Sequence, residues 1–197
     1  LLDLSPGDEV IVPSFTFVST ASAFALRGAR IIFCDIHPDT LALDEQQLGA
    51  LLSSRTKAIV PVHYAGIACE MDAIQRVAQA HGDVAVVEDN AHGLYGKYRG
   101  AYLGTLGKLA AMSFHATKNF SCGEGGAVVV NDSALVERAE MIREKGTDRT
   151  RFYRGEVDFY SWQVLGSSYM LAERLAAILT APLEARPESA SNRSGLW

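Results

Sequence analysis

The chain has 197 residues, of which 48% are hydrophobic and 21% are charged, and its formal net charge is −5. This composition is typical of a globular chain with a substantial core, and no apolar run approaches the roughly 20 residues that a membrane span requires. No basic cluster indicates a nucleic-acid partner.

The three cysteines, Cys34, Cys69 and Cys122, are widely separated along the chain. Their spacing matches no metal-ligand pattern, and an odd number is typical of thiols in a reducing compartment. We therefore expect a cytoplasmic protein without a metal site.

Short apolar runs alternate with helical patterns along the first half of the chain. Strands are expected at residues 10–12, 29–36, 56–62 and 84–87. Helices are expected between them, at residues 19–26, 44–52 and 71–81. Because the strands are apolar throughout and helices separate them, the pattern predicts a doubly wound, mostly parallel α/β sheet. Such sheets bind ligands at the carboxyl ends of their strands.

Two later apolar runs, 109–112 and 127–130, enclose a short loop with Lys118 at its centre. Three glycines follow the lysine at positions 123, 125 and 126, which indicates a tight connection between two strands. A lysine held in such a loop is a candidate amine nucleophile, since amines of lowered pKa form Schiff bases with carbonyl compounds such as pyridoxal phosphate. The alternative interpretation of this stretch alone is a solvated lysine beside a glycine turn.

The remaining segments are less regular. Asp132 is expected to cap a helix that runs to Lys145, and a helix from Tyr169 is expected to end at Pro182. Residues 147–166 between these helices mix charged and aromatic side chains, which indicates a surface segment that packs on another element. We interpret residues 1–183 as one domain and residues 184–197 as an irregular tail, in a chain that is a piece of a longer protein.

Four residues stand at expected strand ends near the lysine: Phe17, Asp89, His92 and Ser113. Each alone is more often a turn or core residue. Together with Lys118 they supply what a pyridine-ring cofactor needs, which is an acid at the ring nitrogen, an amine for the aldehyde, a hydroxyl for the phosphate and an aromatic ring for stacking. The lysine would act twice, first holding the aldehyde and then moving a proton as the base.

Four ordered motifs carry a resemblance to a known family. They are PGDEVIVPSFTF at 6–17, EDNAHG at 88–93, SFHATKN at 113–119 and GEGGA at 123–127. In order and spacing they resemble the motifs of the nucleotide-sugar aminotransferases, which are fold-type I pyridoxal-phosphate enzymes. The resemblance extends from about residue 2 to about residue 183 and implies the large domain of that fold.

The resemblance also implies a role for each residue. Lys118 would form the Schiff base with pyridoxal 5'-phosphate, Asp89 would pair with the pyridinium nitrogen, and Ser113 would bind the phosphate. Phe17 would lie against the ring and His92 near its 3-hydroxyl. The implied reaction moves an amino group from L-glutamate to C4 of a dTDP-linked 4-keto-6-deoxy sugar, in the synthesis of enterobacterial common antigen or a similar cell-surface glycan. The implied assembly is a homodimer.

Some family features are expected to be missing, namely the phosphate-binding loop before the first residue and the small C-terminal domain. Where many relatives have asparagine or arginine after Gly166, this chain has Ser167 and Ser168. A second hypothesis is therefore a truncated remnant that binds cofactor weakly and has little or no activity.

Two further alternatives change the function. Dehydratases of the same fold replace the Schiff-base lysine with histidine, and Lys118 disfavours them. A nucleotide-binding domain would need Gly-x-Gly-x-x-Gly between a strand and a helix, whereas Gly123 to Gly126 leads into a strand.

Overall fold

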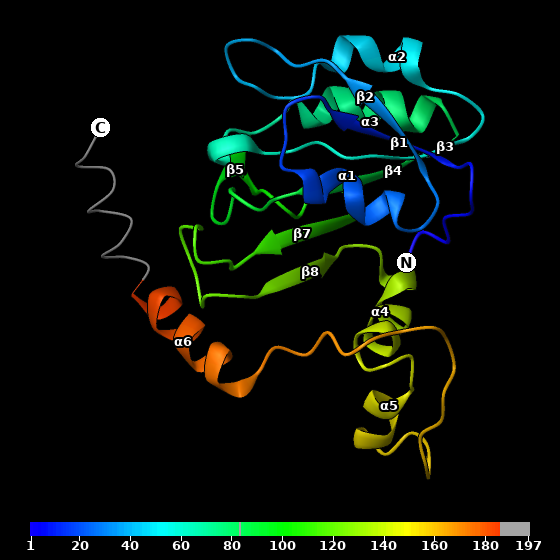
Figure 1. Cartoon of the computed structure of the whole chain (residues 1–197), viewed down its shortest axis with the longest axis vertical. Helices are drawn as coiled ribbons and strands as arrows, with labels where there is room; N and C mark the ends of the chain where they lie inside the picture. Colours follow the sequence, from blue (N-terminus) through cyan, green and yellow to red (C-terminus); the bar gives the residue numbers. More distant parts are fainter. Residues whose placement is uncertain (83, 186–197) are drawn as a thin grey trace.

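The computed structural model describes residues 1–82 and 84–185. Within these residues the main sheet has the strand order β2-β1-β3-β4-β7-β8 (Figure 1). Its strands are β1 (Glu9–Pro13), β2 (Arg30–Cys34), β3 (Thr56–Ile59), β4 (Ala85–Asp89), β7 (Leu109–Ser113) and β8 (Gly126–Val130). Neighbouring strands are parallel except for β7 and β8, which are antiparallel. The predicted doubly wound, mostly parallel sheet is confirmed.

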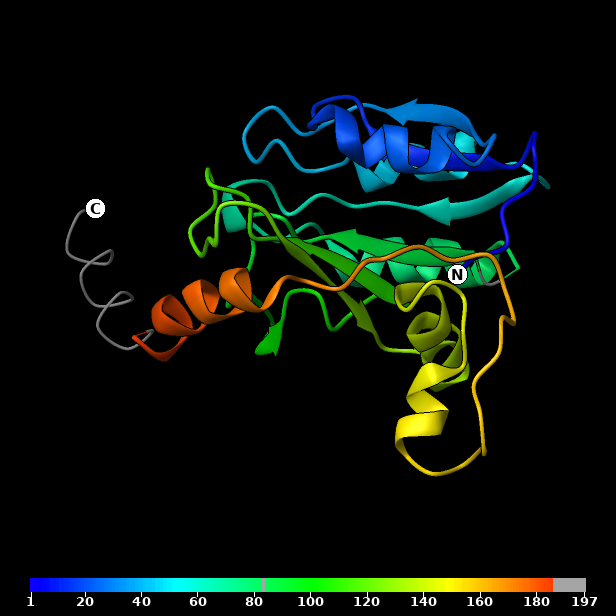
Figure 2. The same cartoon turned by 60° about the horizontal axis from the view of Figure 1, so that its bottom comes forward.

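Helices cover both faces of the parallel part of the sheet (Figure 2). Val10 and Val12 of β1 pack under α1 (Val18–Ala25). Ile11, which points to the opposite face, packs with residues of α2 (Leu48–Leu51) and α3 (Met71–Ala80). Because side chains alternate along a strand, a fully apolar strand fills two separate cores.

The expected elements exist, but several are shorter than the patterns indicated. The strand expected at 56–62 ends at Ile59, and the helix expected at 44–52 is divided into η1 (Glu45–Gln47) and α2. The Asp44 side chain accepts the Gln46 N–H at 3.1 Å, as expected of a capping residue. A 3₁₀ turn, η2 (Tyr64–Gly66), follows β3.

The small hairpin of β5 (Lys97–Tyr98) and β6 (Ala101–Tyr102) was not expected from the sequence. Its turn residues Arg99 and Gly100 have φ values of +48° and +91°. Positive φ at both central residues is typical of a tight hairpin turn. Two-residue strands are too short to produce a recognisable alternation, so the pattern held no signal for them.

Beyond β8 the chain forms η3 (Ser133–Leu135), α4 (Val136–Arg143) and α5 (Arg149–Tyr153). Asp132 accepts the Ala134 N–H at 2.9 Å, which confirms it as a cap. An extended stretch then carries the chain from α5 to α6 (Glu173–Glu184), on the other side of the molecule (Figures 1 and 2).

Two expectations about this last helix were wrong. It begins at Glu173, not Tyr169, and it continues through Pro182 to Glu184. Pro182 removes only the bond to the carbonyl of Ile178, whose side chain is 54% exposed, so water can replace it near the helix end. Glu184 is therefore helical and not part of a tail, and residues 186–197 lie outside the described part of the chain.

The back of the lysine loop is covered by α6. Leu179 packs with Phe114 and Cys122 in one apolar cluster, which Leu171 and Leu175 extend. This helix therefore supports the loop that carries Lys118. Among the described residues, no helix combines the length and the hydrophobicity that a bilayer span requires.

Candidate active site

A cavity of about 560 Å³ opens at the carboxyl ends of the strands, on the face that α1 covers. Its volume lies in the usual range for small-molecule sites. Phe17, Asp89, Ser113 and Lys118 all line it, so four of the five predicted residues share one cavity. The fifth, His92, lies close enough to Lys118 and Asp89 for their charges to affect its pKa.

Asp89 is the last residue of β4, where its backbone N–H donates to the Pro61 carbonyl at 2.9 Å. Its carboxylate accepts two hydrogen bonds, from the Thr20 hydroxyl to Oδ2 at 2.6 Å and from the Ala91 N–H to Oδ1 at 3.1 Å. Each carboxylate oxygen can accept a further bond. Asp89 is therefore an oriented acceptor on the cavity wall.

Lys118 stands in the loop of a β7–β8 hairpin whose pairs run from Leu109↔Val130 to Ser113↔Gly126. Its backbone N–H donates to the His115 carbonyl at 2.9 Å. The hairpin needs glycine at two points for different reasons, one in the loop and one at the start of β8. Gly123 has φ +92°, and a Cβ on Gly126 would lie 2.8 Å from the Met112 carbonyl oxygen. The glycines therefore fix the path of the loop that brings Lys118 to the cavity.

His92 is held by the loop that follows β3. The Ala65 N–H donates to Nδ1 of His92 at 3.2 Å, and the ring meets Tyr64 edge to face, with centroids 5.2 Å apart. Burial lowers the pKa of His92, the nearby Lys118 cation lowers it further, and Asp89 opposes both effects. Because Nδ1 is an acceptor, the neutral ring carries its proton on Nε2 and can donate it to an oxygen.

Phe17 and Ser113 both line the cavity. Phe17 is the N-cap residue of α1 and its ring is 73% exposed. The Ser113 Oγ accepts the His115 N–H at 3.4 Å. The site thus offers an exposed aromatic ring and a hydroxyl, both expected from the sequence.

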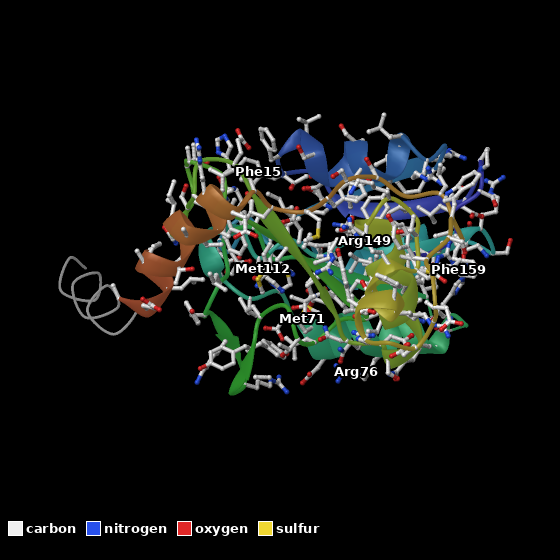
Figure 3. The ribbon with its side chains drawn as sticks, turned by 90° about the horizontal axis from the view of Figure 1, so that it is seen from below. Phe15, Met71, Arg76, Met112, Arg149 and Phe159 are labelled. Atoms are coloured by element: carbon white, nitrogen blue, oxygen red, sulfur yellow. The ribbon has the colours of Figure 1, made fainter. Side chains whose placement is uncertain are left out.

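Figure 3 shows Phe15 and Met112 on the side of α6 and Phe159 at the opposite side of the molecule. Met112 also lines the cavity. Phe15 continues the ring contacts around His92, since its centroid is 5.0 Å from that of Tyr64. An aromatic row of Phe15, Tyr64 and His92 therefore lies beside the site.

Sequence reasoning did not single out Thr20 or Glu88. Thr20 is 7% exposed and binds Asp89, and Glu88 is fully buried beside it. The signal for Thr20 was its nearness to Phe17, which stands three positions before it in the sequence. For Glu88 the signal was a carboxylate inside an apolar strand, which is buried only when it is paired.

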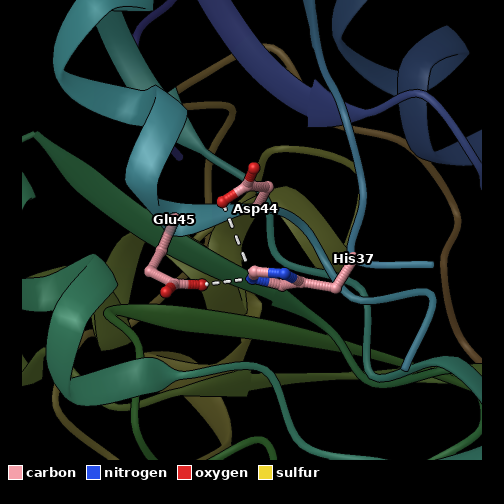
Figure 4. A group of neighbouring side chains, drawn as sticks. All are labelled: His37, Asp44 and Glu45. Carbon is pink, nitrogen blue, oxygen red and sulfur yellow. Dashed lines mark hydrogen bonds and ion pairs between the residues drawn. The ribbon is translucent and has the colours of Figure 1, made fainter. Parts of the chain in front are cut away.

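A second group of polar side chains lies outside the cavity, in the loop after β2 (Figure 4). Among the described residues, His37, Asp44 and Glu45 bring three possible metal-ligand atoms within 4.8 Å of one another. His37 Nε2 lies 2.8 Å from Glu45 Oε2 and 3.6 Å from Asp44 Oδ1. The hydrogen bond that His37 donates to the Glu45 carboxylate raises the pKa of His37, so the group is explained as an ion pair that closes this loop.

Comparison with known proteins gives one consistent result. The family model described as the DegT/DnrJ/EryC1/StrS aminotransferase family matches residues 1–197. An aminotransferase from Psychrobacter cryohalolentis is 32% identical with a TM-score of 0.89, and the match covers 95% of this chain and 48% of that one. Helicobacter pylori PseC, an aminotransferase involved in the biosynthesis of pseudoaminic acid, is 30% identical with a TM-score of 0.84, covering 94% and 48%.

The Streptococcus pneumoniae protein Spr1654 in its PLP-form is 26% identical with a TM-score of 0.81, and the match covers 95% of this chain and 51% of that one. The chain therefore spans about half the length of the solved structures that it resembles. Pyridoxal phosphate is the cofactor of these aminotransferases, as the sequence motifs implied. The chain belongs to the DegT/DnrJ/EryC1/StrS aminotransferase family.

Proposed function

We propose that the cavity binds pyridoxal phosphate, with Lys118 as the residue that bonds its aldehyde. The observation that carries the proposal is the meeting of Lys118, Asp89, Ser113 and Phe17 in one cavity of about 560 Å³. These residues come from separate parts of the chain and supply the anion, amine, hydroxyl and aromatic ring that this cofactor requires. The donor set therefore fits the group.

When bound, pyridoxal phosphate supplies an aldehyde that captures amines and a ring that accepts the electrons left by a broken C–H bond. Asp89 would hold the ring nitrogen in its protonated form, because its carboxylate is already oriented by two hydrogen bonds. The neutral His92 ring would donate its Nε2–H to an oxygen of the ligand. Lys118 Nζ would be the base that carries the proton once the amine is released.

For the whole protein, the proposed reaction is transfer of the amino group of L-glutamate to C4 of a dTDP-4-keto-6-deoxy sugar. The sequence supports this assignment through residues 89–94, 113–121, 161–163 and 166–169, which resemble the corresponding motifs of dTDP-4-amino-4,6-dideoxygalactose transaminase. That activity would place the protein in the cytoplasm, in the synthesis of enterobacterial common antigen.

The proposed assembly is a homodimer. The support is an apolar surface on the segment between α4 and α6, where Tyr153 is 68%, Phe159 76% and Trp162 74% exposed. Large exposed apolar surfaces of this kind mark association sites. Residues 147–166 were expected to pack on another element, and a second subunit would be that element.

Titration with pyridoxal phosphate tests the proposal, with the visible absorbance of the bound cofactor as the measurement. The band should disappear in Lys118→Ala and persist in Lys57→Ala, a control that removes an exposed lysine from β3. A band that survives Lys118→Ala would overturn the choice of nucleophile.

The competing proposal is a truncated remnant of such an aminotransferase that binds the cofactor weakly and has little or no activity. Loss of two charge-assisted hydrogen bonds to the phosphate, each worth roughly 1.5–3 kcal/mol, would weaken cofactor binding by about two to four decades. The same titration distinguishes the two. A band that saturates at micromolar cofactor supports the enzyme, whereas no band at millimolar cofactor supports the inactive remnant.

A further inference from the structure

A chain of two threonine hydroxyls leads from α1 to the carboxylate of Asp89. Thr20 Oγ1 donates to Asp89 Oδ2 at 2.6 Å, across 69 positions of sequence. Thr16 Oγ1 lies 2.8 Å from Thr20 Oγ1. Thr20 is 7% exposed and lines the cavity together with Asp89. The contact therefore joins two elements at the proposed cofactor site.

The number of hydroxyl protons decides which threonine is the donor and which is the acceptor in the Thr16–Thr20 contact. A threonine hydroxyl has one proton, and that of Thr20 is donated to the carboxylate, which can only accept when ionised. Thr20 Oγ1 must then be the acceptor in its contact with Thr16. Thr16 donates to Thr20, and Thr20 donates to Asp89, so each hydroxyl orients the next.

This arrangement differs from the ordinary behaviour of threonine in a helix. Helical threonines commonly return their hydroxyl to the carbonyl four residues earlier. Thr180 of α6 does so, with its Oγ1 donating to the Ala176 carbonyl at 2.9 Å. Thr20 instead gives its hydroxyl proton to a residue of β4. Its hydroxyl therefore serves Asp89 and not its own helix.

We infer that Thr20 is a positioning residue that holds Asp89 in the orientation needed by a protonated ring nitrogen, with Thr16 ordering the Thr20 hydroxyl. The inference rests on the proposed function. The Ala91 N–H fixes Oδ1 and the Thr20 hydroxyl fixes Oδ2, so the carboxylate plane cannot rotate without breaking a bond. The first turn of α1 thus carries both Phe17 on the cavity wall and the group that aims Asp89.

The test compares two probes in Thr20→Val, which removes the hydroxyl but keeps the side-chain shape. One probe is pyridoxal phosphate, and the other is its analogue with C–H in place of the ring nitrogen. Thr20→Val should bind pyridoxal phosphate about tenfold more weakly than wild type, the factor expected for one lost hydrogen bond. Its affinity for the analogue should change by no more than about twofold, because Asp89 has no ring N–H to meet there. Thr20→Ser, which keeps the hydroxyl, should bind pyridoxal phosphate and the analogue with the same ratio of affinities as wild type.

Thr180→Val is the matched control, since it removes a helical threonine hydroxyl away from the cavity, and it should match wild type with both probes. If Thr20→Val lost the same factor of affinity for both probes, Thr20 would determine only the shape of the cavity, and the inference would be overturned. Unchanged binding of pyridoxal phosphate would overturn it too. If wild type itself shows no absorbance that depends on Lys118, the proposed function fails and the positioning role fails with it.

Discussion

His63 donates its Nε2–H to the carboxylate of Glu88 at 2.9 Å, and both side chains are fully buried. Glu88 also accepts the backbone N–H groups of Gly104, Leu106 and Gly107 at 2.6–2.7 Å. Burial alone would raise the pKa of Glu88, but these hydrogen bonds outweigh it and lower the pKa. The pair therefore ties the loop before β7 to the strand that ends in Asp89.

Glu88→Gln is expected to destabilise the protein by about 3 kcal/mol, because an amide NH₂ would face backbone N–H groups that now meet a carboxylate. Urea unfolding followed by circular dichroism measures the change. Glu173→Gln, which alters an exposed residue at the start of α6, should shift the free energy of unfolding by less than about 0.5 kcal/mol. Equal effects of the two variants would refute the assigned role of Glu88.

The ion pair after β2 predicts a pH-dependent contribution to stability. The hydrogen bond that His37 donates to Glu45 raises the pKa of His37, aided by the charges of Glu45, Asp44 and Asp39 and opposed by burial. Because the pKa of His37 is higher in the folded protein, its protonation stabilises the fold at pH values below the pKa of the unfolded chain, which is about 6.5. This stabilisation is lost as the pH rises through the pKa of His37 in the folded protein. His37→Gln should therefore lower Tm more at about pH 6 than at about pH 9. A gap between the two proteins that widens with pH would contradict this.

His92 predicts the opposite dependence. Its pKa is lowered by burial and by Lys118, so protonation favours the unfolded chain. Stability is lost as the pH falls from about 6.5 towards the folded pKa. His92→Asn, whose side-chain oxygen can still accept the Ala65 N–H, should lack this loss. The difference in Tm between wild type and the variant should narrow on acidification, which a melting series across this pH range can show.

Two glycines should respond to alanine in opposite directions. In Gly126→Ala the new Cβ would lie 2.8 Å from the Met112 carbonyl oxygen, so β7 and β8 must separate, at a cost of about 1–3 kcal/mol. In Gly49→Ala, within α2, no atom lies within 4 Å of the new Cβ, and helix propensity predicts a gain of up to about 1 kcal/mol. Denaturant unfolding tests both predictions: the midpoint should fall in Gly126→Ala and rise in Gly49→Ala.

The sheet could be predicted because its strands are apolar throughout, and residues such as Val10, Ile11 and Val12 fill cores on both faces. The course of the chain near Tyr98 and Tyr102 could not, because a hairpin with two-residue strands depends on a turn conformation and not on periodicity. Pro182 gave a misleading signal because a proline near a helix end removes a single bond that water can replace.

The candidate site was predicted unevenly for a similar reason. Asp89 and Lys118 are chemical groups that stand out at strand ends, so composition and order sufficed to single them out. Thr20 acquires its role only from a contact made 69 positions away, and Glu88 only from donors in a later loop. Sequence shows which groups are present, whereas the partners of a hydrogen bond depend on how distant elements meet in the fold.

The antiparallel pairing of β7 with β8 also has a consequence for the order in which the chain folds. The hairpin that carries Ser113 and Lys118 closes only the loop 114–125 between sequence neighbours and can form by local pairing. The contact of Thr20 with Asp89 needs β1, β3 and β4 to be assembled first, through long crossovers that are slower to close. During refolding of the whole chain, the hairpin that carries Lys118 should therefore be structured before the contact of Thr20 with Asp89 exists. A refolding chain would present the amine of Lys118 before it could orient a cofactor ring.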